Sequence, residues 1–180
     1  SSITKRKRTH VLADILDALS QGNRRPPIYG VLCGKKGEPF DHLLEQKIQQ
    51  FNLEGKLRMT GFVSPSKEWM AACDLILAPS EREPFGRAVF EAAEAGVSLI
   101  MSSDSGAAEI IDNGVNGFTC DPHDIPQWIA MTERLLNDQA MRRKVTEASV
   151  ARLAHFSADH HADRMLRIYH DLSRRPVKGA

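Results

Sequence analysis

Glu83-Pro-Phe-Gly-Arg-Ala-Val-Phe-Glu91 carries two carboxylates eight positions apart, with a Phe-Gly pair between them. The residues before it, Asp74 to Ser80, are typical of a short buried strand that ends in turn residues, and Gly86 to Ala95 is typical of a helix. Glu91 lies within the apolar run Ala88 to Ala93, where a carboxylate costs free energy unless it is paired or directed at a ligand. The stretch therefore predicts a strand, a loop and a helix whose junction is functional.

A loop between a parallel strand and the following helix favours the binding of an anion. Helix N-termini present unpaired N–H groups and a positive dipole end at this edge of a sheet. Gly86 has no β-carbon, so a diphosphate could approach the first amides of the helix closely. Carboxylates accept hydrogen bonds well from vicinal diols, and we expect Glu83 and Glu91 to face the hydroxyls of one ligand.

The order of landmarks along the chain resembles the nucleotide-sugar-binding half of retaining glycosyltransferases of the GT-B fold, the Glu-x7-Glu, group 1 or family 4-like type. Besides the two glutamates, the matching segments are Lys7–Leu16, Val31–Gly34, Leu57–Val63, Asp74–Ser80, Ser105–Gly117 and Phe156-Ser157. The glutamate spacing alone is a weak signal, but the ordered landmarks cover nearly the whole chain. The resemblance implies an α/β fold with a Rossmann-like, doubly wound, mostly parallel sheet, helices on both faces and additional C-terminal helices.

The same resemblance implies roles for individual residues. Glu91 would hold the ribose hydroxyls, and Glu83, the candidate catalytic residue, would contact and orient the donor sugar. Amides near Gly86 would receive the diphosphate, the Val63 backbone would meet the nucleobase, and Lys7 would reach the phosphates. The implied donor-binding set is Lys7, Val63, Glu83, Pro84, Phe85, Gly86, Arg87 and Glu91.

The implied reaction is transfer of a hexose from a UDP-, GDP- or ADP-sugar, with retention at the anomeric carbon and with neither a metal nor a separate cofactor. The family's active site lies between two Rossmann-like domains, and this chain matches only the second. The acceptor-binding N-terminal domain is thus a missing partner, and we expect the isolated domain to bind donor without turnover. The family's arginine shortly before the phosphate-binding lysine has no counterpart, and Ser105 replaces the first of two glycines.

The basic run Lys5-Arg-Lys-Arg8 has three interpretations: a phosphate contact through one lysine, a patch for nucleic acid or anionic membrane, or a solvated helix start. The run is short and lacks interleaved aromatic residues, so nucleic acid is the weakest interpretation and no nucleic-acid partner is expected. Lys7 is the favoured phosphate ligand, although its basic neighbours could shift the register.

Length and composition predict a single globular domain over residues 1–180, with a sheet core over about 1–122 and C-terminal helices over about 123–173. The chain is 42% hydrophobic and 26% charged, with a net charge of +1. Cys33, Cys73 and Cys120 are odd in number and lack a Cys-x-x-Cys pair, which disfavours a disulfide framework and a zinc site. We expect a cytoplasmic protein, with peripheral association of the full-length enzyme at the inner face of the membrane left open.

Helical and strand patterns alternate along the chain. The predicted strands are 28–33, 57–62, 74–78, 97–102 and 117–120, and the predicted helices are 7–21, 39–51, 65–72, 86–95, 106–112, 124–138, 139–154 and 158–173. The last helix carries Met165, Leu166, Ile168 and Tyr169, so it is expected to expose an apolar face that favours self-association.

Each glutamate also has a plainer interpretation. Glu83 could simply complement a helix N-terminus, and Glu91 could join Glu94 on a solvated helix face. The chain would then be a non-catalytic module that binds a nucleotide or a protein partner. Nucleotide titration of the parent protein and of Glu91→Ala separates this alternative from the donor-binding domain.

Overall fold

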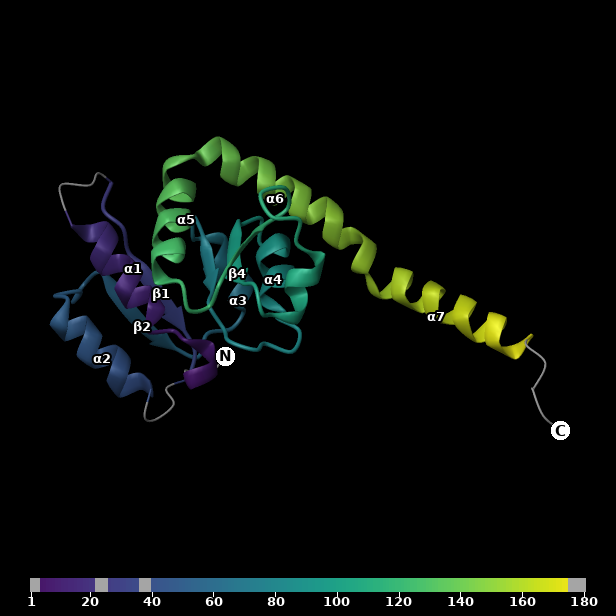
Figure 1. The fold of residues 1–180 in the computed structure, drawn as a ribbon, viewed down its shortest axis with the longest axis horizontal. Helices are drawn as coiled ribbons and strands as arrows, with labels where there is room; N and C mark the ends of the chain where they lie inside the picture. The colour runs from purple at the N-terminus through teal and green to yellow at the C-terminus, as the bar shows by residue number, and fades with distance from the viewer. Residues whose placement is uncertain (1–3, 22–25, 36–39, 175–180) are drawn as a thin grey trace.

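The computed structural model describes residues 4–21, 26–35 and 40–174, in which helices alternate with parallel strands (Figure 1). The strands are β1 (Gly30–Cys33), β2 (Leu57–Gly61), β3 (Ile76–Ala78), β4 (Leu99–Ser102) and β5 (Phe118–Cys120). The α-helices are α1 (Val11–Ser20), α2 (Phe40–Gln50), α3 (Ser66–Ala71), α4 (Ala88–Glu94), α5 (Ile125–Asn137), α6 (Gln139–Leu153) and α7 (Ala158–Ser173), and the 3₁₀ turns are η1 (Lys5–Lys7), η2 (Gly106–Ile110) and η3 (Ala154–Phe156). The predicted α/β fold class is confirmed.

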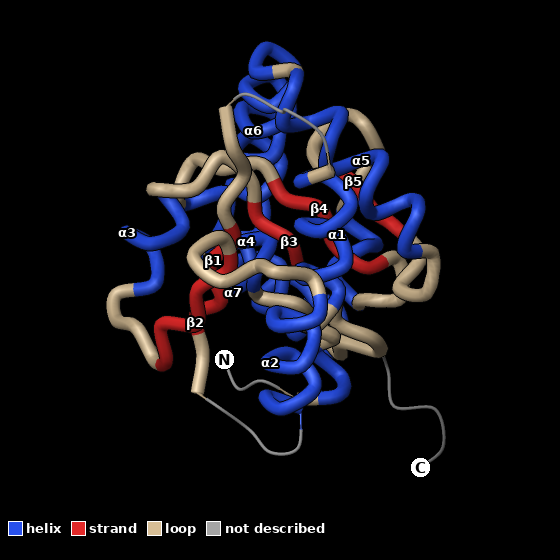
Figure 2. The backbone as a smooth tube through the Cα atoms, turned by 90° about the vertical axis from the view of Figure 1, so that its left-hand side faces the viewer, coloured by secondary structure: helices blue, strands red, loops and turns tan. Residues whose placement is uncertain are grey.

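The described strands form two hydrogen-bonded parallel sheets, one of β1 and β2 and one with the order β3-β4-β5 (Figure 2). Gly30 pairs with Leu57 in the first sheet, and Ile76 pairs with Leu99 in the second. Each parallel pair needs a crossover connection, which contains α2 between β1 and β2, α4 between β3 and β4, and only the turn η2 between β4 and β5. The strand predictions identify the individual strands but not their division between two sheets.

Helix α1 packs against both sheets. Val11 and Ile15 belong to a buried cluster with Trp128 of α5, next to the three-stranded sheet. Leu16, on a different side of the same helix, belongs to a cluster with Leu44 of α2, next to β1 and β2. One amphipathic helix therefore holds the two sheets in a fixed relation.

Strand β4 is buried on both faces, as expected for a strand with helices on each side. Ile100 lies in the cluster that contains Trp128, whereas Leu99 and Met101 lie in a second cluster with Val89 of α4. The alternation of side chains along the strand sends neighbouring residues to opposite clusters. Because β3 pairs with β4, the loop that follows β3 begins beside a well-packed core.

The predicted helix 7–21 is wrong at its start. The chain forms η1 and then α1, and Arg8 between them has a left-handed backbone with φ of 47°. The Arg8 amide donates to the Lys5 carbonyl at 3.1 Å, which closes the short turn. The Arg6 carbonyl accepts from the Glu81 amide at 2.7 Å, so a contact with the loop after β3 overrides local helix propensity.

The predicted helix 106–112 forms only the 3₁₀ turn η2. Its first residue, Gly106, donates its amide to the Glu83 carbonyl at 2.9 Å, so this segment is held against the loop after β3. The boundaries of the other predicted elements lie within about two residues of those observed, although residue 39, the predicted start of one helix, is outside the described residues.

Helix α7 extends away from the rest of the domain (Figure 1), and none of its residues is buried. Leu166 is 64% exposed, and Ile168, Tyr169 and Leu172 are also exposed. The expected apolar face is therefore present, while self-association through it remains a prediction. Among the described residues, no helix is both long and apolar enough to cross a membrane.

Candidate functional site

The loop after β3 rests on the start of η2. The Ala107 amide donates to the Phe85 carbonyl at 2.6 Å, beside the bond from the Gly106 amide to Glu83. A β-carbon added to Gly106 would overlap the Pro84 carbonyl oxygen. The family-like glycine at this position is thus required by the close approach of two backbones, and the sequence identified it only as a landmark.

Gly86 meets the same segment from the other side. Its φ is 87°, and an added β-carbon would lie 2.6 Å from the Ser105 Oγ. A left-handed backbone and this lack of space both favour glycine. Helix α4 begins at Ala88, so Gly86 and Arg87 precede the helix and the predicted start at residue 86 is two residues early.

Three consecutive amides lie where this loop meets α4. Among the described residues, no hydrogen bond is donated by the amides of Phe85, Gly86 or Arg87. Gly86 is left-handed and Arg87 is right-handed, with φ of −53° and ψ of −20°. Successive unpaired amides with backbones of alternating hand form a concavity suited to an anion.

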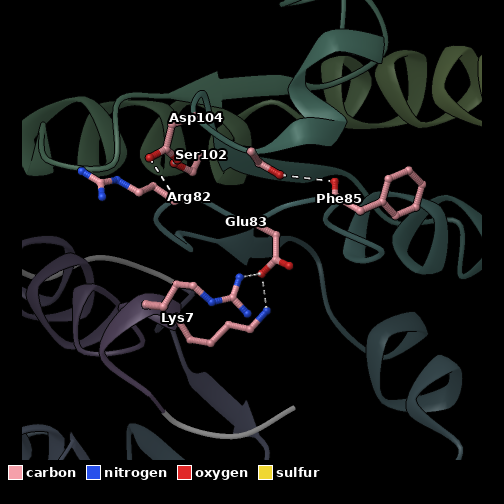
Figure 3. A network of polar contacts seen from close by, with 8 residues as sticks. Lys7, Arg82, Glu83, Phe85, Ser102 and Asp104 are labelled. Carbon is pink, nitrogen blue, oxygen red and sulfur yellow. Dashed lines mark hydrogen bonds and ion pairs between the residues drawn. The ribbon is translucent and has the colours of Figure 1, made fainter.

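Glu83 is held by two basic side chains from the N-terminal turn (Figure 3). The Lys7 Nζ lies 2.6 Å and the Arg6 Nη1 lies 2.7 Å from the same carboxylate oxygen, Oε2. Burial by itself raises the pKa of the Glu83 carboxyl, but the hydrogen bonds and charges of Lys7 and Arg6 outweigh it and hold the pKa below its usual range. The carboxylate is therefore charged and paired in this structure.

Glu91 is paired separately. Arg87, one helical turn earlier, donates from Nη2 at 2.8 Å and from Nε at 3.2 Å to the Glu91 Oε1. The hydrogen bond and the charge of Glu91 raise the pKa of Arg87, whose side chain is 81% exposed. An exposed pair of this kind contributes little stability and is easily exchanged for another contact. Glu83 is thus paired with Arg6 and Lys7 and Glu91 with Arg87, and no hydrogen bond or ion pair joins Glu83 to Glu91 in the described part of the chain.

Val63 and Phe85 were also predicted to belong to the site. Val63 is half-buried in the turn between β2 and α3. Phe85 is 54% exposed, and Figure 3 shows its ring directed away from the Glu83 carboxylate. This ring stacks on Phe90 with a centroid distance of 5.3 Å, and Phe90 packs edge-on against Phe156 at 6.3 Å. The structure brings Lys7 to Glu83 and leaves the role of Val63 a prediction.

Two cavities lie near the three-stranded sheet. One of about 470 Å³ is lined by Asp104, Ser105, Gly106 and neighbouring residues, directly beside the segment that supports the loop. Asp104, one of the lining residues, accepts from the Arg82 amide at 3.0 Å and from the Ser102 hydroxyl at 2.7 Å (Figure 3). The other, of about 370 Å³, lies where β3 and β4 begin, against α6. None of the predicted site residues lines either cavity.

Sequence reasoning did not assign Arg6 to the site. Arg6 lies beside Lys7 in the basic run, and composition offers no reason to prefer one basic residue over the next. The distinguishing fact is the 3₁₀ turn, which presents both side chains to Glu83. Among the described residues, no group of His, Cys, Asp and Glu side chains is arranged to hold a metal ion.

Comparisons with known proteins agree on a family. The model of the family described as "Glycosyl transferases group 1" matches residues 1–152. A 2-deoxystreptamine N-acetyl-D-glucosaminyltransferase of Niallia circulans is 34% identical over 97 residues, which are 53% of this chain and 24% of that protein. A glycogen synthase of Mycobacterium tuberculosis is 31% identical over 145 residues, which are 78% of this chain and 34% of that protein.

A solved structure gives the same picture. The crystal structure of Anabaena HepE in complex with UDP-glucose superimposes with a TM-score of 0.83 at 25% identity, over 95% of this chain and 47% of that one. The present chain therefore spans about half of the HepE chain and a quarter to a third of the two curated relatives. The loop after β3 lies within residues 1–152, which the family model matches.

Proposed function

Because the chain belongs to the group 1 glycosyl transferases, we propose that it is the nucleotide-diphosphate-sugar-binding domain of a retaining glycosyltransferase. The whole enzyme would transfer a hexose from this donor to an acceptor bound by a further, N-terminal domain. The observation that carries the proposal is the row of three amides at Phe85, Gly86 and Arg87, which donate no hydrogen bond within the described part of the chain, because such a row suits a diphosphate.

The proposed mechanism uses fixed dipoles and charges. The amides near Gly86 and the basic side chain of Lys7 would stabilise the negative charge that develops on the leaving diphosphate. Because these groups supply the positive charge, the proposal requires no metal. Glu83 would orient the hexose and Glu91 would accept hydrogen bonds from the ribose hydroxyls, which places the reacting atoms for transfer.

The identity of the donor is proposed from the chemistry of the site and from one similar solved structure. The HepE structure was determined with UDP-glucose, so a UDP-hexose is the first donor to test, with GDP- and ADP-sugars as alternatives. Val63 would meet the nucleobase through its backbone. We further propose a cytoplasmic enzyme, with association at the inner face of the membrane as a property of the full-length protein.

Titration tests this function directly. Isothermal titration with UDP, GDP and ADP and their hexose conjugates should show binding of one series, and Glu91→Ala should weaken it about tenfold or more, since charge-assisted hydrogen bonds are lost. Glu94→Ala is the matched control, because Glu94 is exposed on the same helix and makes no side-chain contact in the described part of the chain. Absence of binding, or equal affinities for the two variants, would contradict the proposal.

A second candidate is a non-catalytic module that binds a nucleotide or a protein partner. The observation that favours it is that both glutamates are already paired, Glu83 with Arg6 and Lys7, and Glu91 with Arg87. Under this alternative the pairs are structural, and substitution of Glu91 would leave nucleotide affinity unchanged.

A further inference from the structure

Arg6 and Lys7 place two positive charges on one carboxylate oxygen. Both side chains reach the Glu83 Oε2, at 2.7 and 2.6 Å, while one carboxylate neutralises only one charge. The nearby Glu81 carboxylate lies instead against the Arg82 side chain, at 3.9 Å, and the His123 ring, at 3.8 Å. The contact therefore keeps an excess of positive charge beside the unpaired amides of the same loop.

The backbone holds Arg6 in this position. The Arg6 carbonyl accepts from the Glu81 amide, so η1 is fastened to the loop that carries Glu83. Only Nη1 of the Arg6 guanidinium donates a hydrogen bond among the described residues, and its side chain is 45% exposed. The guanidinium thus has donors to spare, in a planar arrangement that matches a phosphate.

We propose that Arg6 is a ligand of the donor diphosphate. While the donor is absent, the Glu83 carboxylate binds Arg6 and Lys7 where a phosphate oxygen binds in the complex. This inference rests on the proposed function and adds to it a residue and an exchange of counter-ions. A diphosphate offers more charge and more acceptor oxygens than one carboxylate, so it displaces Glu83 from both cations. No covalent bond changes in this step.

The exchange links two events. When the diphosphate takes the cations, the Glu83 carboxylate loses its two partners and becomes free to accept hydrogen bonds from the hexose hydroxyls. When the donor leaves, the carboxylate returns and the cations are again paired. Glu83 therefore competes with the diphosphate for Arg6 and Lys7, and it also contacts the sugar. The first role lowers the affinity for the diphosphate, whereas the second raises the affinity for the hexose.

Variants of the intact chain separate the roles. UDP and inorganic pyrophosphate are titrated into wild type, Arg6→Gln, Glu83→Gln and the control Lys5→Gln, whose side chain is exposed and makes no contact in the described part of the chain. We expect Arg6→Gln to weaken both ligands about tenfold and Lys5→Gln to change them less than about threefold. We expect Glu83→Gln to bind both ligands more tightly than wild type, a gain that a folding defect cannot produce.

The results overturn the inference in two ways. If UDP binds and Arg6→Gln matches Lys5→Gln, Arg6 is not a ligand; if Glu83→Gln binds UDP no more tightly than wild type, the carboxylate is not a competitor. Either result leaves the proposed function intact. If wild type binds pyrophosphate through Arg6 but binds no nucleotide, the proposed function and the donor role of Arg6 fail, and only the exchange of Glu83 for a diphosphate stands. If wild type binds neither ligand, both fail.

Discussion

The Lys7 Nζ and the Glu83 Oε2 lie 2.6 Å apart, although 76 residues separate the two in the sequence. The contact joins the N-terminal turn η1 to the loop after β3, and the backbone bond from the Glu81 amide to the Arg6 carbonyl runs beside it. The same loop carries the unpaired amides that begin at Phe85. The position of the proposed phosphate site therefore depends on both ends of this contact.

Stability should depend on pH through Glu83. The pKa of this carboxyl lies below the usual 4.5 in the folded protein. A carboxyl with a depressed folded pKa stabilises the protein above its unfolded pKa, and this contribution is lost as the pH falls through the folded value. The free energy of unfolding, measured with urea, should thus be higher for wild type than for Glu83→Gln at pH 7, and the gap should close as the pH falls below 4.5. A gap that stays constant over this range would refute the assignment.

Substitution of Gly86 should test the packing of the loop on η2. Gly86→Ala combines a left-handed backbone with a contact to Ser105, and we expect a cost of about 2–4 kcal/mol in urea unfolding. Gly96→Ala is the control, because its φ is 71° but no atom lies within 4 Å of the added β-carbon, and it should cost about 1 kcal/mol. Adding Ser105→Ala should recover part of the loss at Gly86. Equal costs for the two glycines would show that the close approach is absent.

Helix α1 should be essential for both sheets. Ile15 and Leu16 are each 1% exposed and lie in different clusters, so truncation of either to Ala should cost about 2–5 kcal/mol. Val150→Ala, at a position that is 48% exposed, should cost less than about 0.5 kcal/mol. Hydrogen exchange should show β1 and β4 losing protection together in the Ile15 and Leu16 variants. Loss of protection in one sheet alone would argue against the bridging role of α1.

Helix α7 should promote self-association. Leu166 and Leu172 are 64% and 54% exposed on a helix without buried residues, and covering such a face is favourable. Sedimentation equilibrium should show concentration-dependent dimers of wild type that the double variant Leu166→Glu, Leu172→Glu abolishes. Val115→Glu, which alters a loop residue that is 59% exposed, should still dimerise. A monomeric wild type at high concentration would remove this interface from the account.

Local chemistry accounts for the parts of the fold that the sequence predicts well. Asp124 and Pro126 mark the start of α5, and the Asp124 side chain accepts from the Gln127 amide as an N-cap should. The break at Arg8 has no such signal, because the residues around it are adequate helix formers and the cause is a contact with Glu81. Tertiary contacts of this kind are not visible in sequence periodicity.

The candidate site likewise has some features that the sequence predicts and others that depend on tertiary contacts. Gly86 and the two glutamates were identified from spacing and from the resemblance, and Gly86 does need the absence of a β-carbon. The partners of the glutamates were not predicted, because Arg6 is indistinguishable from its basic neighbours until η1 directs it. Arg87 was expected to contribute its amide, and the structure shows in addition that its side chain pairs with Glu91.

The most direct test is a crystal structure of this chain with UDP. We predict that the diphosphate contacts the amides of Phe85, Gly86 and Arg87, with Arg6 and Lys7 on its oxygens and Glu83 displaced from these two cations. The ribose hydroxyls should lie within hydrogen-bond distance of the Glu91 carboxylate. A diphosphate bound elsewhere, with Glu83 still joined to Arg6 and Lys7, would contradict the central claim.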